Sequence, residues 1–153
     1  MAPRRINADE LASVLPPGGL TLVSSCSAES DLLVRMVEAA GDALGSMRFS
    51  GIFVPGLNRP TWRAGAQSRV LSFFQTPELR AEADRVDFLP IYYGQVSALY
   101  AAERPSAVLF MCSPPDADGM CSFGVETAFI PDFWRSAPVR IAHINPAMPR
   151  TVG

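Results

Sequence analysis

The chain has 153 residues, of which 48% are hydrophobic and 18% charged, and its formal net charge is −2. This length and apolar content suit one globular domain with a buried core, and the charge provides no basic surface for nucleic acid. No apolar run approaches the roughly 20 residues that a membrane-spanning helix needs, and no apolar segment follows Arg4 and Arg5 as in a signal peptide. We therefore expect a cytoplasmic, bacterial-type protein with neither a nucleic-acid nor a membrane partner.

Short apolar runs bounded by Gly, Pro or Ser predict the strands. In chain order they cover residues 20–25, 47–54, 70–74, 87–93, 107–112 and 139–145. We expect the buried strand segments at residues 20–23, 52–54, 70–73, 108–111 and 141–144. Helices are expected at residues 7–15, 31–44, from 76 onward, 96–102 and 129–135. Strands that alternate with helices indicate an α/β domain with a mainly parallel sheet and helices on both faces.

Small polar residues follow the first predicted strand, at Ser25, Cys26 and Ser27. Small residues let backbone N–H groups approach a ligand, so this turn is either a cradle for an oxyanion or phosphate or an ordinary strand-to-helix turn. The loop of residues 55–60 carries Gly56 and Asn58, and it either lines a cleft or only connects two elements. Both loops follow predicted strands, as do residues 113–119 and 145–150. In a parallel sheet all four should meet at one edge.

The reactive residue types restrict the chemistry. Three cysteines without a secretion signal argue against a disulfide framework, and a single histidine without a C-x-x-C pair argues against structural zinc. Cys26 has no histidine near it in sequence, so we interpret it as a small hydrophobic residue rather than a nucleophile. Asp116 and Asp118 offer too few oxygen ligands for a hard cation. No metal is expected.

Two motifs in the second half carry a family resemblance. Residues 113–124 contain Ser113-Pro-Pro-Asp, then Gly119, then Ser122-x-Gly124, and the last predicted strand runs into Asn145-x-x-Met148-Pro149-Arg150. On these residues the chain resembles the first domain of the acetyl-CoA hydrolase/transferase family, a branch of the CoA-transferases that includes 4-hydroxybutyrate CoA-transferases. The resemblance extends over nearly the whole chain. His143 stands where that family usually has Glu, and we interpret it as a cleft-edge or structural residue.

The resemblance implies a domain of the sugar-phosphate isomerase/CoA-transferase type over residues 1–153. It implies an acyl-CoA thioester and a carboxylic acid as substrates, coenzyme A being a substrate rather than a cofactor. Arg150 is favoured to contact an acyl carboxylate or a CoA phosphate. The expected substrate-binding residues are Ser25, Cys26, Ser27, Gly56, Asn58, Asn145, Met148, Pro149 and Arg150.

No catalytic residue is assigned, because the resemblance places the nucleophilic glutamate on a second domain that we expect to be absent from this chain. Glu29, Glu126 and Asp116 are conceivable substitutes, and no feature of the sequence selects one. The first hypothesis is therefore the N-terminal half of an acyl-CoA transferase or hydrolase, inactive alone. The alternative is a non-catalytic standalone remnant or binding module. A third class, a sugar-phosphate isomerase, needs a general base near a phosphate loop, and the sequence shows none.

A half-enzyme should expose apolar surface for a second domain or a second copy of itself. We expect this surface late in the chain, and its candidates are Phe123, Phe129, Phe133, Trp134 and residues 147–148. In the opposing interpretation these aromatic residues fill the core of the domain itself.

Overall fold

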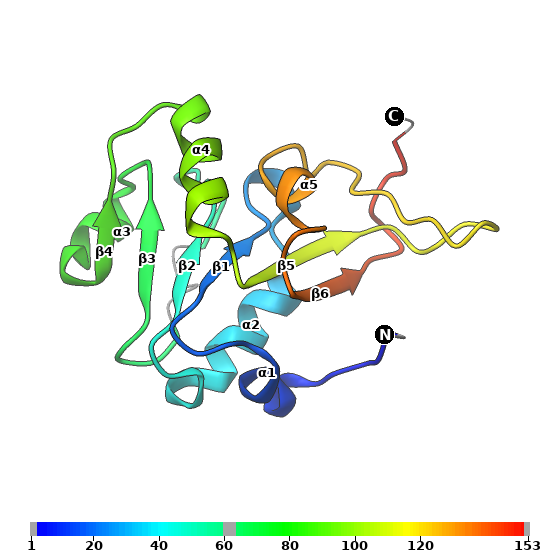
Figure 1. Cartoon of the computed structure of the whole chain (residues 1–153), viewed down its shortest axis with the longest axis horizontal. Helices are drawn as coiled ribbons and strands as arrows, with labels where there is room; N and C mark the ends of the chain where they lie inside the picture. The colour runs from blue at the N-terminus through cyan, green and yellow to red at the C-terminus, as the bar shows by residue number, and fades with distance from the viewer. Residues whose placement is uncertain (1–2, 60–63, 152–153) are drawn as a thin grey trace.

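The computed structural model describes residues 3–59 and 64–151, which build a parallel sheet in the order β4-β3-β2-β1-β5-β6 (Figure 1). The strands are β1 Leu20–Val23, β2 Arg48–Ser50, β3 Arg69–Ser72, β4 Val86–Phe88, β5 Ala107–Cys112 and β6 Val139–Ile144. The helices are α1 Ala8–Val14, α2 Asp31–Ala40, α3 Pro77–Ala81, α4 Tyr93–Glu103 and α5 Ile130–Phe133. Short 3₁₀ turns occupy Cys26–Ala28, Gly41–Leu44 and Ala83–Arg85.

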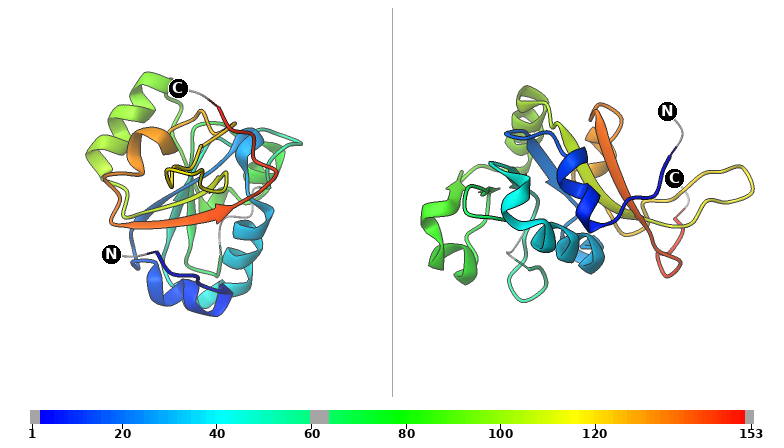
Figure 2. Two further views of the ribbon diagram at one scale, coloured as in Figure 1. Left: turned by 90° about the vertical axis from the view of Figure 1, so that its right-hand side faces the viewer. Right: turned by 90° about the horizontal axis from the view of Figure 1, so that it is seen from below.

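Helices cover both faces of the sheet, so the predicted fold class is confirmed. Figure 2 shows α1 and α2 on one side and α4 and α5 on the other. Alternating strand residues feed the two apolar layers: in β1, Val23 packs in the layer of α1 and α2, and Leu22 packs in the layer of α4 and α5. In the described part of the chain no helix combines the length and apolarity needed to cross a membrane.

The strand order changes direction between the neighbouring strands β1 and β5: β2 to β4 follow on one side of β1, and β5 and β6 follow on its other side. β1 pairs with β2 on one side and with β5 on the other, and all of its residues are buried. In open α/β sheets such a switch point opens a crevice at the carboxyl ends of the strands, where ligands bind. Because every pairing is parallel, the loops after β1, β2, β5 and β6 leave the sheet at that same edge, as predicted. Pro60, in the predicted loop of residues 55–60, lies outside the described residues.

The second predicted strand segment, residues 52–54, is wrong. β2 ends at Ser50, and the next residue, Gly51, passes close to β1: a side-chain carbon at Gly51 would lie 2.9 Å from the Val23 carbonyl oxygen. Beyond it the Ile52 N–H donates to the Ser25 Oγ at 2.9 Å instead of to a strand. Ile52 and Phe53 are nevertheless buried, which explains why the segment has the composition of a strand.

The last strands also differ from expectation. β4 ends at Phe88, and α4 begins at Tyr93 within the segment expected to be extended, where the Tyr92 N–H donates to the Gln95 side chain. β6 is an edge strand rather than a buried one. One of its faces, which includes Arg140 and Ile144, is exposed to solvent.

Of the aromatic residues expected at the surface, Phe133 is buried in the core, and Phe123, Phe129 and Trp134 are partly buried and pack against it. Phe123 packs against Phe110 and Trp134, and Phe129 and Phe133 pack edge-on against buried Tyr100. The opposing interpretation is therefore correct for these aromatic side chains.

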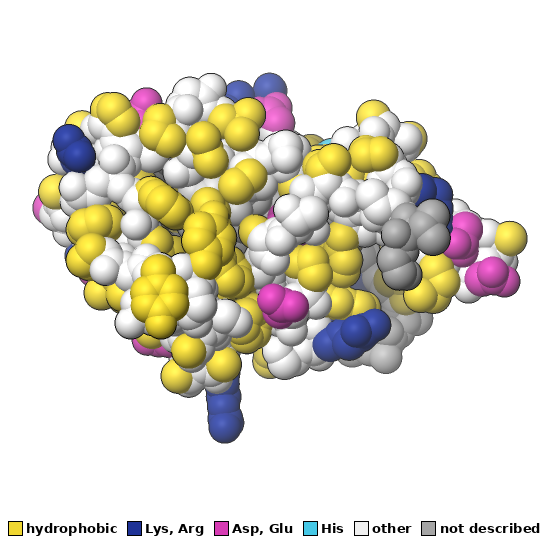
Figure 3. Space-filling view, turned by 90° about the horizontal axis from the view of Figure 1, so that it is seen from above, with side chains coloured by type: hydrophobic (Ala, Val, Ile, Leu, Met, Phe, Trp, Pro, Cys, Tyr) yellow, Lys and Arg dark blue, Asp and Glu magenta, His cyan; other side chains and the backbone are white. Residues whose placement is uncertain are grey.

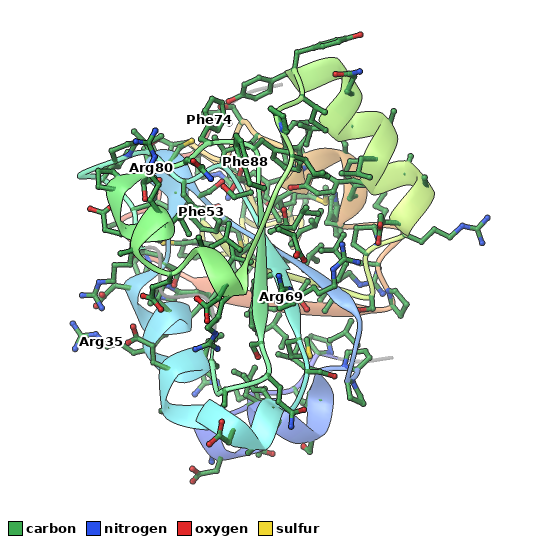
Figure 4. All side chains as sticks on the ribbon, turned by 90° about the vertical axis from the view of Figure 1, so that its left-hand side faces the viewer. Arg35, Phe53, Arg69, Phe74, Arg80 and Phe88 are labelled. Carbon is green, nitrogen blue, oxygen red and sulfur yellow. The ribbon has the colours of Figure 1, made fainter. Side chains whose placement is uncertain are left out.

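One group of exposed apolar side chains lies at the other end of the sheet. We call them the β3–β4 aromatic patch, and its members are Phe74, Phe88, Leu89, Tyr92 and Tyr93. Tyr92 is 71% exposed, and the rings of Phe74 and Tyr93 lie 6.3 Å apart. Figure 3 shows hydrophobic side chains gathered over this half of the molecule, and Figure 4 shows Phe74 and Phe88 at the same end of their strands.

Candidate functional site

Asn58 fastens the loop after β1 to the loop after β2. Its Oδ1 accepts hydrogen bonds from the N–H groups of Cys26 at 3.1 Å and Val54 at 2.9 Å. Its Nδ2 donates to the Cys26 carbonyl at 2.8 Å. Ser25 Oγ, as described above, accepts from the Ile52 N–H. The polar groups of Asn58 and Ser25, two predicted binding residues, thus hold the loops together.

Cys26 has a left-handed backbone, with φ of 51°, and its thiol donates to the Ile52 carbonyl at 3.5 Å. Burial raises the pKa of this thiol, and the nearby charge of Glu126 raises it further. A thiol with a raised pKa holds little thiolate, so the structure agrees with Cys26 as a packing residue rather than a nucleophile. Ser27 and Gly56, by contrast, are exposed at the loop tips.

Arg150 joins the loop after β6 to the loop after β5, which extends away from the sheet in Figure 1. Its Nη1 donates to Ser113 Oγ at 3.1 Å and to the carbonyls of Pro114 and Met120 at 3.0 and 3.2 Å. Its Nη2 pairs with Asp116 at 2.6 Å. Hydrogen bonds from backbone N–H groups, that of Met120 first, and the charge of Arg150 lower the pKa of Asp116.

The remaining motif residues also pack between loops. Asn145 Oδ1 accepts from the Ala147 N–H at 2.9 Å, and its Nδ2 donates to the Met111 sulfur at 3.1 Å. Met148 is buried against Gly124, whose φ is +59°. A side-chain carbon at Gly124 would lie 2.6 Å from the Pro149 carbonyl oxygen, so only glycine allows the two loops this close approach.

His143 Nδ1 lies 2.8 Å from the Ser30 Oγ, which also accepts from the Leu33 N–H at the start of α2. The lone histidine therefore links β6 to α2, which agrees with the structural interpretation. Among the described residues, no group of three or more His, Cys, Asp or Glu side chains is placed to hold a metal ion.

Sequence reasoning missed the position of Glu126. Its side chain is buried at the β1–β5 crevice and 3% exposed, and one carboxylate oxygen accepts from the Ala128 N–H at 3.0 Å. Burial raises the pKa of Glu126, and the neighbouring Ser24 hydroxyl and the backbone N–H groups of Ala128 and Ser25 partly oppose the rise. The one signal in the sequence is a single carboxylate inside the otherwise uncharged run from Phe123 to Phe129.

An open hollow of about 620 Å³ lies over the loop that carries Glu126. Of the nine predicted binding residues, Arg150 contributes to its lining; Cys121, Phe123, Asp132 and Thr151 line it as well. The hollow thus combines a guanidinium, carboxylates and an aromatic ring. Ligand sites commonly have this size and this mixture of apolar walls and few polar groups.

Comparisons with known proteins support a class. No family model matches the chain. It shares 37% identity over 71 residues with the 4-hydroxybutyrate coenzyme A transferase of Clostridium kluyveri, which is 45% of this chain and 17% of that protein. RipA from Yersinia pestis superposes with a TM-score of 0.81 at 21% identity, over 97% of this chain and 38% of that one.

A third comparison is with the 4-hydroxybutyrate CoA-transferase of Porphyromonas gingivalis, which has a TM-score of 0.70 at 20% identity. The match covers 97% of this chain and 35% of that one. This chain therefore spans little more than a third of the solved structures that it matches. The shared fold defines a CoA-transferase-like α/β domain. Together with the sequence match, it supports a CoA-transferase family N-terminal domain, as the motifs after β5 and β6 predicted.

Proposed function

We propose that the chain is the N-terminal part of an acyl-CoA transferase or acyl-CoA hydrolase and contributes loops to a cleft for CoA or the acyl group. The observation that carries the proposal is the convergence of four loops at the carboxyl edge of the sheet. The hollow there has room for a short acyl chain or part of CoA, and Arg150 supplies a positive charge in its lining.

In this proposal the nucleophile is a glutamate on a second domain, which forms a thioester with CoA. Two of the conceivable carboxylates in this chain are already engaged: Asp116 pairs with Arg150, and Glu29 accepts from the Arg59 N–H at 3.1 Å. The role left to this domain is to bind and orient substrate and to exclude water from the reacting groups. The β3–β4 aromatic patch offers apolar surface to a second domain or a second copy.

A binding module without catalysis is the second candidate. The observation in its favour is that Phe133 is buried in the domain's own core and that Phe123 and Phe129 pack against this core, as a self-contained unit requires. In this case the same hollow would bind a CoA ester and no transfer would follow.

Calorimetric titration of the purified chain with CoA and acetyl-CoA tests the proposal. We expect binding, and a several-fold loss of affinity in Arg150→Met, because a charge-assisted contact is removed. Arg140→Met, which changes an exposed arginine on the edge strand β6, is the matched control. A folded chain that binds neither CoA nor acetyl-CoA at millimolar concentration would refute the proposal. Transfer of acetyl groups to an acceptor acid by the pure chain would refute the second-domain nucleophile.

A further inference from the structure

Two buried polar groups at the β1–β5 crevice lack hydrogen-bond partners among the described residues. One is Oε2 of Glu126, whose side chain reaches the crevice from the loop after β5. The other is Oγ of Ser24, which is 1% exposed at the end of β1. The two side chains are neighbours, since the Ser24 hydroxyl is one of the groups that oppose the rise in the pKa of Glu126.

Leaving such groups unpaired is costly. A buried donor or acceptor without a partner destabilises a protein by about 1–3 kcal/mol, and a charged group by more. Neither group is needed to hold the loop, because the Ala128 N–H already binds the other oxygen of Glu126, and the Ser24 N–H already donates to the Leu109 carbonyl at 2.9 Å. Buried polar groups that the fold does not use are typical of sites that a ligand completes.

The chemistry of the pair selects the group that would complete it. Glu126 Oε2 requires a hydrogen-bond donor, and the Ser24 hydroxyl can donate to an acceptor. A hydroxyl group provides both at one atom. An anion would meet the Glu126 carboxylate at close range, and a metal ion would find too few charged ligands here.

Of the pair, Glu126 belongs to the lining of the hollow, together with Arg150, so the hollow offers a ligand one guanidinium and one buried carboxylate. We propose that Glu126 and Ser24 form a recognition site for a hydroxyl group of the ligand that occupies this hollow. The inference rests on the proposed function for the identity of that ligand. Under that function the hydroxyl has two sources: a hydroxylated acyl chain, or the pantetheine arm of CoA.

Matched ligands and variants separate these sources. Wild-type protein, Glu126→Gln and Ser24→Ala are titrated with 4-hydroxybutyrate and butyrate, and separately with pantetheine. If the acyl chain supplies the hydroxyl, wild type prefers 4-hydroxybutyrate by about tenfold, because a site built to bind a hydroxyl leaves its own groups unpaired with the analogue. The preference then falls in both variants. If the pantetheine arm supplies it, the two acids bind alike and pantetheine binding falls about tenfold in both variants.

Glu38→Gln on the exposed face of α2 is the control and should match wild type in both arms. The circular dichroism spectrum checks that each variant is folded, and Ser24→Ala keeps the test open if Glu126→Gln is not. The inference is overturned if neither arm responds to either variant. If the melting temperature changes in both variants while every affinity stays the same, Glu126 and Ser24 bind only an ordered water, and the inference is overturned. If the wild-type protein does not bind CoA, the proposed function itself is refuted.

Discussion

Asn58 holds the backbone of Cys26 from both sides, accepting from its N–H at 3.1 Å and donating to its carbonyl at 2.8 Å. A neighbouring strand would make the same two contacts. β1 ends at Val23 and β2 at Ser50, so the amide of Asn58 continues their cross-linking where the sheet itself has stopped. The shape of the crevice edge therefore depends in large part on the Asn58 side chain.

We expect Asn58→Ala to lower the free energy of unfolding by about 1–3 kcal/mol, because the three hydrogen bonds of Asn58 to the backbone of Cys26 and Val54 are lost. Asn58→Asp keeps both acceptor contacts but loses the donor and sets a carboxylate against a carbonyl, so it should also destabilise. Urea denaturation measures both. An alanine variant as stable as wild type would show that the amide does not hold the loop.

Gly124 and Gly56 form a matched pair of glycines with positive φ. A side chain at Gly124 would collide with Met148 and Pro149, whereas nothing lies within 4 Å of one at Gly56. Gly56→Ala should cost only the backbone strain, about 1 kcal/mol, and Gly124→Ala clearly more. Thermal unfolding of the two variants gives the comparison. Equal losses would contradict the packing of the two loops at Gly124.

The buried carboxylate of Glu126 predicts a pH-dependent stability. Burial raises its pKa in the folded protein above the ordinary value of 4.5, so the folded state holds the proton more tightly than the unfolded state. The associated stability is fully present below pH 4.5 and is lost as pH rises through the raised pKa. Glu126→Gln has no proton to lose. Its melting temperature should therefore increase relative to wild type across this window and run parallel to wild type above it.

Several other carboxylates do not disturb this comparison. Glu10, Glu78 and Asp116 have lowered pKa values and produce the opposite trend, but they are present in both proteins and cancel in the difference. The pKa of the neighbouring Cys26 thiol is raised as well, which keeps it neutral in the window. Melting curves at half-unit pH steps suffice. A constant difference from pH 4 to 8 would contradict a buried carboxyl at this position.

The three thiols should react with maleimide at different rates. Cys121 is exposed, Cys26 is partly buried and Cys112 is buried. Burial and the neighbouring Cys121 raise the pKa of Cys112 to about 12, so it holds almost no thiolate at pH 8. We expect one fast, one slow and one protected thiol by mass spectrometry, with the fast phase missing in Cys121→Ser. Two fast thiols in the native protein would be the contrary result.

The isolated chain should associate or bind apolar dyes through the β3–β4 aromatic patch. The combined change Phe74→Ser and Tyr92→Ser should reduce dye fluorescence several-fold, because both side chains are substantially exposed. Phe133→Leu, in the core, serves as the control. Light scattering measures association in the same samples, and a monomer that binds no dye would contradict an exposed apolar surface.

Local pattern predicted the fold well where the chain is continuously apolar. β5 has the predicted bounds, residues 107–112. All six of its residues are apolar and buried, so the apolar run in the sequence begins and ends with the strand. The buried segment of β2 was predicted too late in the chain, because Ile52 and Phe53 are buried outside the sheet. They are apolar because they are buried, not because they belong to a strand. The end of β2 is therefore determined by tertiary contacts, which the sequence pattern does not record.

The site was predicted at the level of loops and not of side chains. Parallel strands alone bring Ser25, Asn58 and Arg150 to one edge. Their hydrogen bonds to other loops depend on contacts more than 25 residues apart in sequence, and no local pattern records them. Glu126 was named among three conceivable carboxylates, but its burial was missed for the same reason, since its position beside Ser24 exists only once β1 and β5 are paired.

The strand order has a consequence for synthesis on the ribosome. Four neighbouring strands, β1 to β4, are complete once the chain has emerged as far as Phe88, and each pairs with the strand made just before it. This half of the sheet can form while the rest is still being translated. β5 must then add beside β1, which was made more than 80 residues earlier, and such distant pairing is slow. Until it does, one side of β1 is an unpaired edge open to chaperones or to another nascent chain.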